Sequence, residues 1–135
     1  GGHLTAMQLT ADWNKDAADL PPDFIKGAFA VSGLYDLAPL LHVSFNSDLR
    51  LTEDQIAPLS PAGMRPTVRA PLYLSVGGNE SDEFKRQTSL LAEKWRELGV
   101  TEIAMPGFNH LVVIEESANA QSPLFKAAMR MMGEA

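Results

Sequence analysis

The sequence contains no cysteine among its 135 residues. This absence excludes disulfides, thiolate metal sites and a thiol nucleophile, and it fits a reducing compartment, so we expect a cytoplasmic protein. No apolar run approaches the roughly 20 residues that a membrane-spanning helix requires. The net charge is -6 and the positive residues are scattered, so the chain has no basic stripe to neutralise phosphates. Neither a membrane nor a nucleic acid is therefore an expected partner.

The start of the chain also lacks familiar features. It has no initiator methionine and no charged segment followed by an apolar core, so Gly1 does not begin a signal peptide. Instead, two glycines lead directly into a stretch with apolar residues at Leu4, Met7, Leu9 and Trp13. This pattern predicts the exit from a tight turn into a helix. It raises the question of which residues form the turn itself.

Strand and helix signals then alternate along the chain. A hydrophobic fraction of 45% over this length indicates a soluble globular domain with a real core. The expected elements are strands at residues 27–31, at residues 72–76 and in "VTEIAMPG", a helix from a cap at Ser81 to Leu98, a closing helix in "SPLFKAAMRMMGEA", and short helical pieces near residues 37–41 and 53–57 in a proline-broken connector. This order predicts an α/β protein, a parallel sheet with covering helices.

Such sheets carry their chemistry in the loops beyond the carboxyl ends of the strands. Glu80 and Asp82 follow the second expected strand, and His110 follows the third. A carboxylate at this place can accept the imidazole N–H and hold the tautomer that serves as a base. A nucleophile is missing from the pattern. In α/β-hydrolases the chain order is nucleophile, acid, histidine, with the serine in a G-x-S-x-G turn between a strand and a helix.

Other carboxylates and histidines have simpler interpretations. Asp82 is better placed as a first-turn helix charge, and Asp36 after the first strand is better placed as a turn cap, although either could replace Glu80 as the acid. His3 lies on the opening helix and is expected to pack or to hydrogen-bond. His42 has no partner motif and is expected in the connector or at the surface.

Four blocks of sequence carry a family resemblance: "GGHLTA", "SGLYDLAPLL", "VGGNESDEFKRQT" and "FNHLVVIEES". Together they resemble the second half of kynurenine formamidase (arylformamidase) and the related esterases of the α/β-hydrolase group. The family's turn typically reads G-H-S-A-G-G-H-L, of which this chain has only the last four positions. The resemblance implies that residues 1–135 form the carboxyl-terminal portion of a single α/β-hydrolase domain whose nucleophile-bearing half is missing.

The resemblance also implies site residues. The family's acid falls on Glu80, where the family often has aspartate, and its catalytic base falls on His110. Asn79 and Phe108 are expected to line the pocket. No residue of this chain corresponds to the serine, which is expected two places before Gly1, and the oxyanion-hole donors would also lie upstream. No metal and no cofactor is implied.

The predicted function is hydrolysis of an amide or ester bond by a serine hydrolase, with N-formyl-kynurenine as the substrate that the resemblance implies. A general carboxylesterase of the same fold and a non-catalytic interaction domain remain open. The chain alone lacks the nucleophile and is expected to be inactive. Its expected partners are a small-molecule substrate and the missing N-terminal half, packed against Phe29 and Val31 as a second chain or upstream segment. A homodimer is also left open.

Overall fold

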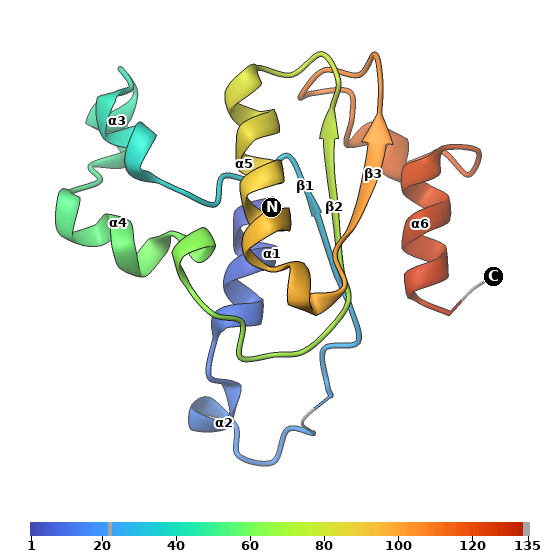
Figure 1. Ribbon diagram of the computed structural model, residues 1–135, viewed down its shortest axis with the longest axis horizontal. Helices are drawn as coiled ribbons and strands as arrows, with labels where there is room; N and C mark the ends of the chain where they lie inside the picture. The colour runs from blue at the N-terminus through green and yellow to red at the C-terminus, as the bar shows by residue number, and fades with distance from the viewer. Residues whose placement is uncertain (22, 134–135) are drawn as a thin grey trace.

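A parallel β-sheet with helices on both faces organises the computed structural model, which describes residues 1–21 and 23–133 (Figure 1). In chain order the elements are α1 (Gly2–Thr10), α2 (Trp13–Asp16), β1 (Ala28–Val31), η1 (Ala38–His42), α3 (Asn46–Leu49), α4 (Glu53–Leu59), η2 (Pro61–Gly63), β2 (Leu72–Gly77), α5 (Asp82–Lys94), η3 (Arg96–Leu98), β3 (Thr101–Met105), η4 (Glu115–Ala118) and α6 (Pro123–Met131), where η marks a 3-10 helix. The predicted fold class, α/β with a parallel sheet, is confirmed.

The sheet has the strand order β1-β2-β3 within the described residues. β1 and β3 each pair with β2 in parallel. Ala30 lies opposite Leu74 in the first pairing, and Ser75 lies opposite Ile103 in the second. All three strands therefore end at the same edge of the sheet. β1 hydrogen-bonds to β2 on one side, and its other side has no strand beside it in the part of the chain that the structure describes.

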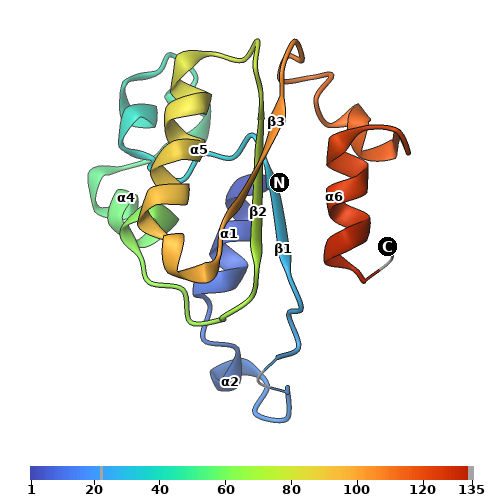
Figure 2. The same ribbon diagram turned by 45° about the vertical axis from the view of Figure 1, so that its right-hand side comes forward.

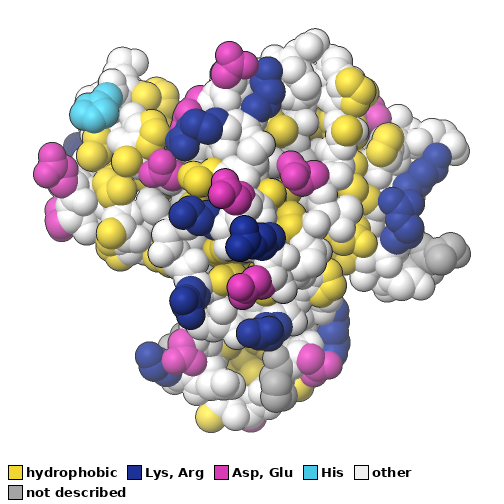
Figure 3. Space-filling view, in the orientation of Figure 1, with side chains coloured by type: hydrophobic (Ala, Val, Ile, Leu, Met, Phe, Trp, Pro, Cys, Tyr) yellow, Lys and Arg dark blue, Asp and Glu magenta, His cyan; other side chains and the backbone are white. Residues whose placement is uncertain are grey.

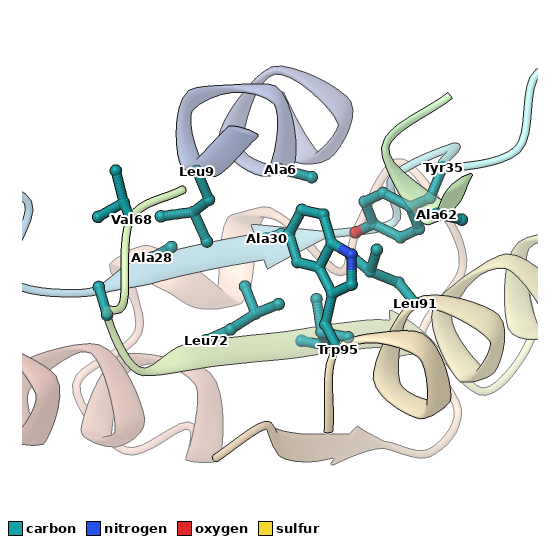
Figure 4. Packing of buried hydrophobic residues seen from close by; sticks show 12 residues of the cluster. Ala6, Leu9, Ala28, Ala30, Tyr35, Ala62, Val68, Leu72, Leu91 and Trp95 are labelled. Carbon is teal, nitrogen blue, oxygen red and sulfur yellow. The ribbon is translucent and has the colours of Figure 1, made fainter. Parts of the chain in front are cut away.

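The main core lies between the sheet and the two helices on one face, α1 and α5 (Figure 2). β2 is an almost continuous apolar run, as is typical of a strand with both faces covered. Leu72 and Leu74 of β2 meet Leu91 and Trp95, which come from the apolar stripe of α5 and the residue after it. Figure 4 shows Trp95 reaching across toward Tyr35 and α1. This packing fixes β2 and the start of α5, the two elements that border the loop containing Glu80.

The buried face of α1 differs from the predicted one. The helix ends at Thr10, so Trp13 belongs to the next element, and Leu4 is 64% exposed. Leu9 is buried, as its place in the pattern predicts, and Gly2 and Ala6 are the other buried residues of the helix. The reason is close approach: a Cβ on Gly2 would lie 2.7 Å from the Cα of Gly33, so no residue larger than glycine fits at the start of this contact. Leu4 lies on the opposite side of the helix.

A second, smaller cluster covers the other face of the sheet. Met105, Val113 and Leu124 are its buried members, and Leu124 belongs to α6. Phe29 and Val31 of β1 pack against this cluster and remain partly exposed. Figure 2 shows α6 on this side of the sheet, with the short η4 beside it. The cover is therefore thinner here than on the face that carries α1 and α5.

The connector between β1 and β2 contains the two short helical pieces predicted from sequence, found as η1 and α4, together with the unpredicted α3. These elements form a lobe beside the sheet (Figure 1). On the face shown in Figure 3, cationic and anionic side chains are interspersed over α5, and no large patch of one sign is visible. Among the described residues, no helix is long and apolar enough to cross a membrane.

Candidate active site

The predicted site residues lie in the loops that leave β2 and β3. β2 ends at Gly77 and its loop carries Glu80, while β3 ends at Met105 and its loop carries His110. Both loops emerge at the same edge of the sheet because the strands are parallel neighbours. Their side chains can therefore meet.

Glu80 and His110 are in direct contact, as predicted. The Nδ1 atom of His110 lies 2.6 Å from Oε2 of Glu80. The Glu80 side chain is fully buried, whereas the His110 side chain is half-exposed. Oε1 of Glu80 accepts the Gly77 N–H at 2.8 Å and the Ser32 hydroxyl. With the carboxylate accepting on both oxygens, Nδ1 carries the proton and Nε2 is left as the free acceptor of the imidazole.

Ser32 is part of the site although the sequence analysis did not select it. It directly follows β1, and its N–H donates to the Ser75 carbonyl at 2.8 Å, so the pairing of β1 with β2 continues one residue beyond the strand. Its φ is +49°, in the left-handed region that serine seldom adopts. Non-glycine residues with unfavourable backbone conformations are found more often at functional sites than elsewhere.

Phe84 also contacts the site. Its ring lies against the imidazole of His110, with ring centroids 4.5 Å apart and planes inclined by 33°. Phe84 belongs to the first turn of α5, and its N–H is capped by the Ser81 hydroxyl at 3.4 Å. The cap that starts the helix therefore also places the ring.

The Nε2 atom of His110 makes no hydrogen bond within residues 1–21 and 23–133.

Asn79 and Phe108, the expected pocket residues, lie in the two loops that carry Glu80 and His110. The Asn79 N–H donates to the Phe108 carbonyl at 3.0 Å, and Asn79 Nδ2 donates to the Gly107 carbonyl at 2.9 Å. Phe108 packs against the core cluster of Met105, and neither residue lines the two cavities that border His110. These contacts tie the loop after β2 to the loop after β3.

A tight backbone contact joins the same two loops. A Cβ on Gly77 would lie 2.3 Å from the Phe108 carbonyl oxygen and 3.2 Å from Oε1 of Glu80. No side chain other than hydrogen fits there without displacing one of the two loops. Glycine at this position is thus a condition for the contact between Glu80 and His110.

The competing carboxylates lie elsewhere. The Asp82 side chain is fully exposed and pairs with Lys85 at 3.1 Å, as a first-turn charge of α5. Asp36 accepts the Ala38 N–H and pairs with Arg86 at 3.3 Å. Neither carboxylate is hydrogen-bonded to His110, so Glu80 is the acid that the geometry supports.

The other histidines also have their expected surroundings. Nε2 of His3 lies 2.8 Å from the Leu59 carbonyl and ties α1 to the end of α4. His42 is exposed in the last turn of η1. Among the described residues, no group of three or more histidine and acidic side chains is arranged to hold a metal ion.

Two cavities border His110. The first has a volume of about 400 Å³ and is lined by five leucines from residues 34–51, by Phe84, and by the imidazoles of His3 and His110. The second has a volume of about 540 Å³ and is lined mainly by apolar side chains, including Phe29, Val31 and Leu124. Ser32 and His110 contribute to both cavities.

A parallel sheet with an acid after one strand and a histidine after the next has the arrangement of an α/β-hydrolase in its carboxyl-terminal part. No protein-family profile matches the chain. Two curated relatives are named kynurenine formamidase: one from Salmo salar, 33% identical over 142 residues, and one from Danio rerio, 31% identical over 141 residues. Each alignment covers 99% of this chain and 47% of the relative. The resemblance predicted from sequence is confirmed, and the chain spans about half the length of these relatives.

A solved structure supports the same fold. The crystal structure of a proposed thioesterase from Silicibacter sp. tm1040 superposes with a TM-score of 0.77 and 30% sequence identity. The match covers 90% of this chain and 44% of that one. The three-stranded sheet described here therefore corresponds to part of a larger protein in the solved structure as well.

Proposed function

We propose that this chain supplies the acid and the histidine of a serine hydrolase that cleaves an amide or ester bond. The observation that carries the proposal is the 2.6 Å contact between His110 Nδ1 and the buried carboxylate of Glu80, with Nε2 free. A buried acid that holds the Nδ1–H tautomer leaves Nε2 available to accept a proton from a nucleophile. The relatives' names and the solved structure support the class of reaction.

The chemistry follows from this pair. A serine hydroxyl supplied by another polypeptide segment attacks the carbonyl carbon of the substrate, and its proton passes to Nε2 of His110. Glu80 orients the ring and stabilises the imidazolium. When the tetrahedral intermediate collapses, the C–N or C–O bond breaks and the proton passes to the leaving nitrogen or oxygen. Water then repeats the sequence on the acyl-serine and releases the acid.

N-formyl-kynurenine is the substrate we propose first, because both curated relatives carry the name kynurenine formamidase. The first cavity can take an aryl group, since leucines and Phe84 form most of its wall beside His110. The same apolar wall suits the acyl or alkyl part of an ester. The second candidate is therefore a general esterase, which the resemblance to a proposed thioesterase also favours.

We further propose that the segment carrying the nucleophile packs along β1. β1 has a single strand neighbour in the described part of the chain. In a parallel pair, alternate residues direct their N–H and C=O groups to opposite sides, and those of Phe29 and Val31 point away from β2. The second cavity lies next to these residues and is largely apolar. The relatives are about twice as long as this chain, so they contain enough polypeptide for such a segment.

The activity is tested on the complete polypeptide encoded by the gene that contains this chain. Formate release from N-formyl-kynurenine is compared with hydrolysis of p-nitrophenyl acetate and of an acyl thioester. A preference for the formamide in kcat/KM supports the first substrate, and a preference for either ester supports the second. His110→Ala should abolish turnover, while His42→Ala, which changes an exposed histidine, should not. Absence of all three activities would leave the interaction domain as the better interpretation.

The packing along β1 is tested on residues 1–135 expressed alone. We expect no cooperative thermal transition by circular dichroism and self-association by analytical ultracentrifugation, because the apolar surface at β1 contributes roughly 25 cal/mol per Å² when it is covered. We also expect no hydrolysis. A soluble monomer with a cooperative transition would contradict the proposed packing, but not the proposed chemistry.

A further inference from the structure

We infer that Ser32 is a positioning residue for the acid–histidine pair. Its hydroxyl fixes the Glu80 carboxylate in the orientation in which Oε2 receives the Nδ1–H of His110. The consequence for turnover rests on the proposed function, whereas the consequence for the tautomer of His110 does not. Ser32 lies 48 positions before Glu80 in the sequence.

The two oxygens of Glu80 have different neighbours. Oε2 contacts His110, and Oε1 accepts both the Ser32 hydroxyl and the Gly77 N–H. The terminal torsion of a glutamate side chain has only a broad preference, so a single donor on Oε1 restrains the carboxylate plane less than two donors do. Two donors that reach Oε1 from different strand ends hold the plane. The hydrogen bonds to a charged acceptor are also the stronger kind.

Ser32 is well anchored for this role. Its N–H is bonded to the Ser75 carbonyl at 2.8 Å, and its hydroxyl reaches from the end of β1 to the loop after β2. The positive φ of +49° is unfavourable for a residue with a Cβ. The surrounding structure therefore has to impose this backbone conformation on Ser32. In this conformation the Ser32 hydroxyl forms its hydrogen bond with Glu80.

A nucleophilic role for Ser32 is disfavoured by the same bond. A hydroxyl has one proton, and that of Ser32 is donated to Glu80. His110, the base of the proposed mechanism, has its own contact with the other oxygen of the carboxylate and none with Ser32. Ser32 thus acts through Glu80 and not on the substrate.

The test uses Ser32→Ala and Ser32→Gly in the complete polypeptide, with Ser75→Ala as the matched control. Both substitutions at residue 32 remove the hydroxyl, and glycine also relieves the positive φ, which protects the test against a folding failure of the alanine variant. Ser75 is a buried serine of β2 whose hydroxyl donates to the Ile103 carbonyl at 2.9 Å and not to Glu80.

The first readout is the imidazole 15N spectrum of His110 at a pH where the ring is neutral, which measures the tautomer without any substrate. We expect the Nδ1–H tautomer to dominate in the wild type and in Ser75→Ala, and to lose population in both Ser32 variants. The second readout is kinetic. We expect kcat to fall about 10- to 100-fold in both Ser32 variants with KM within about twofold, as for loss of a hydrogen bond to a charged group.

Three results would overturn the inference: an unchanged tautomer and kcat in both Ser32 variants, a defect in Ser32→Ala that Ser32→Gly does not share, or an equal defect in Ser75→Ala. The second result would assign Ser32 a backbone role only. If the wild-type polypeptide hydrolyses none of the substrates, the proposed function fails, and the tautomer measurement still decides the role of Ser32.

Discussion

The ring of Phe84 lies against the imidazole of His110, with centroids 4.5 Å apart, while Glu80 holds the same imidazole through Nδ1. The two contacts restrain the ring in different ways. The carboxylate fixes which nitrogen carries the proton, and the phenyl ring limits tilting of the imidazole plane. Because the His110 side chain is half-exposed, these two contacts are its main restraints within the described structure.

Phe84→Ala should therefore lower activity without unfolding the protein. Aromatic pairs contribute about 0.5–1.5 kcal/mol beyond their buried area, so we expect kcat/KM to fall by up to about tenfold. Phe24→Ala is the matched control, because it removes another aromatic pair, Phe24 with Trp13 at 5.4 Å, far along the chain from the site. Equal loss of activity in the two variants would argue against a specific role of Phe84.

Glu80→Gln should reduce turnover severely, by about 10^4-fold, because the amide cannot stabilise the imidazolium and can hold the wrong tautomer. The side chain keeps its size, so we expect only the decrease in melting temperature that comes from weakening the buried hydrogen bonds of the carboxylate. Glu93→Gln changes an exposed carboxylate on α5 and should leave turnover unaltered. Steady-state kinetics checks both variants, and near-normal activity of Glu80→Gln would remove Glu80 from the mechanism.

Gly77→Ala should destabilise the protein and separate the two loops of the site. The added Cβ would meet the Phe108 carbonyl oxygen at 2.3 Å, a forced overlap that typically costs about 1–3 kcal/mol. Gly63→Ala is the control, because a Cβ at Gly63 meets nothing within 4 Å. Thermal denaturation measures the difference between the two variants. A Gly77→Ala variant as stable and as active as the control would contradict the packing described here.

Tyr35 should make the protein sensitive to alkali. Burial raises the pKa of Tyr35 well above its usual value of about 10, because the phenolate is poorly solvated in the core. The stabilising effect of the neutral phenol is complete below the pKa of the unfolded chain and is lost as the pH rises above about 10. We expect Tyr35→Phe to flatten the fall of melting temperature in this range, as measured by thermal denaturation at a series of pH values.

The same substitution has a second expected effect at neutral pH. The Tyr35 hydroxyl is buried and makes no hydrogen bond within the described residues. Removing it loses no partner, so Tyr35→Phe should change the free energy of unfolding by less than about 1 kcal/mol, or stabilise the protein. Equilibrium denaturation checks this. A large destabilisation would mean that the hydroxyl has a partner in the complete polypeptide.

The sequence predicted the elements whose signals are local. β2 is an almost continuous apolar run ended by glycine, and its bounds were predicted closely. α5 begins after the predicted cap at Ser81, but it ends at Lys94, and the separate 3-10 helix η3 covers the predicted end at Leu98. The contact between Glu80 and His110 could also be predicted, since parallel strands bring their following loops to one edge. Its catalytic role stays a prediction.

Other features depend on distances that no local pattern contains. Ser32 precedes a glycine after a strand and resembles an ordinary turn residue, and only the fold brings its hydroxyl to Glu80. Phe84 lies in the first turn of α5, and its contact with His110 also depends on the fold and not on a local pattern. The prediction for α1 gave weight to Leu4, whereas close approach to β1 selects the small side chain of Gly2. The signal for Ser32 would be a hydroxyl directly after a strand that neighbours the acid.

The loops after β2 and β3 are tied by hydrogen bonds from Gly78 to the Met105 carbonyl at 2.8 Å, from the Asn79 N–H to Phe108 and from Asn79 Nδ2 to Gly107. Glu80 and His110 are thus carried by two loops that are hydrogen-bonded to each other. Their relative orientation is set once, when the chain folds, and the entropy of that ordering is not lost again in each reaction cycle. In the proposed mechanism, the substrate carbonyl and the serine that attacks it would therefore have to align with an imidazole that is already oriented.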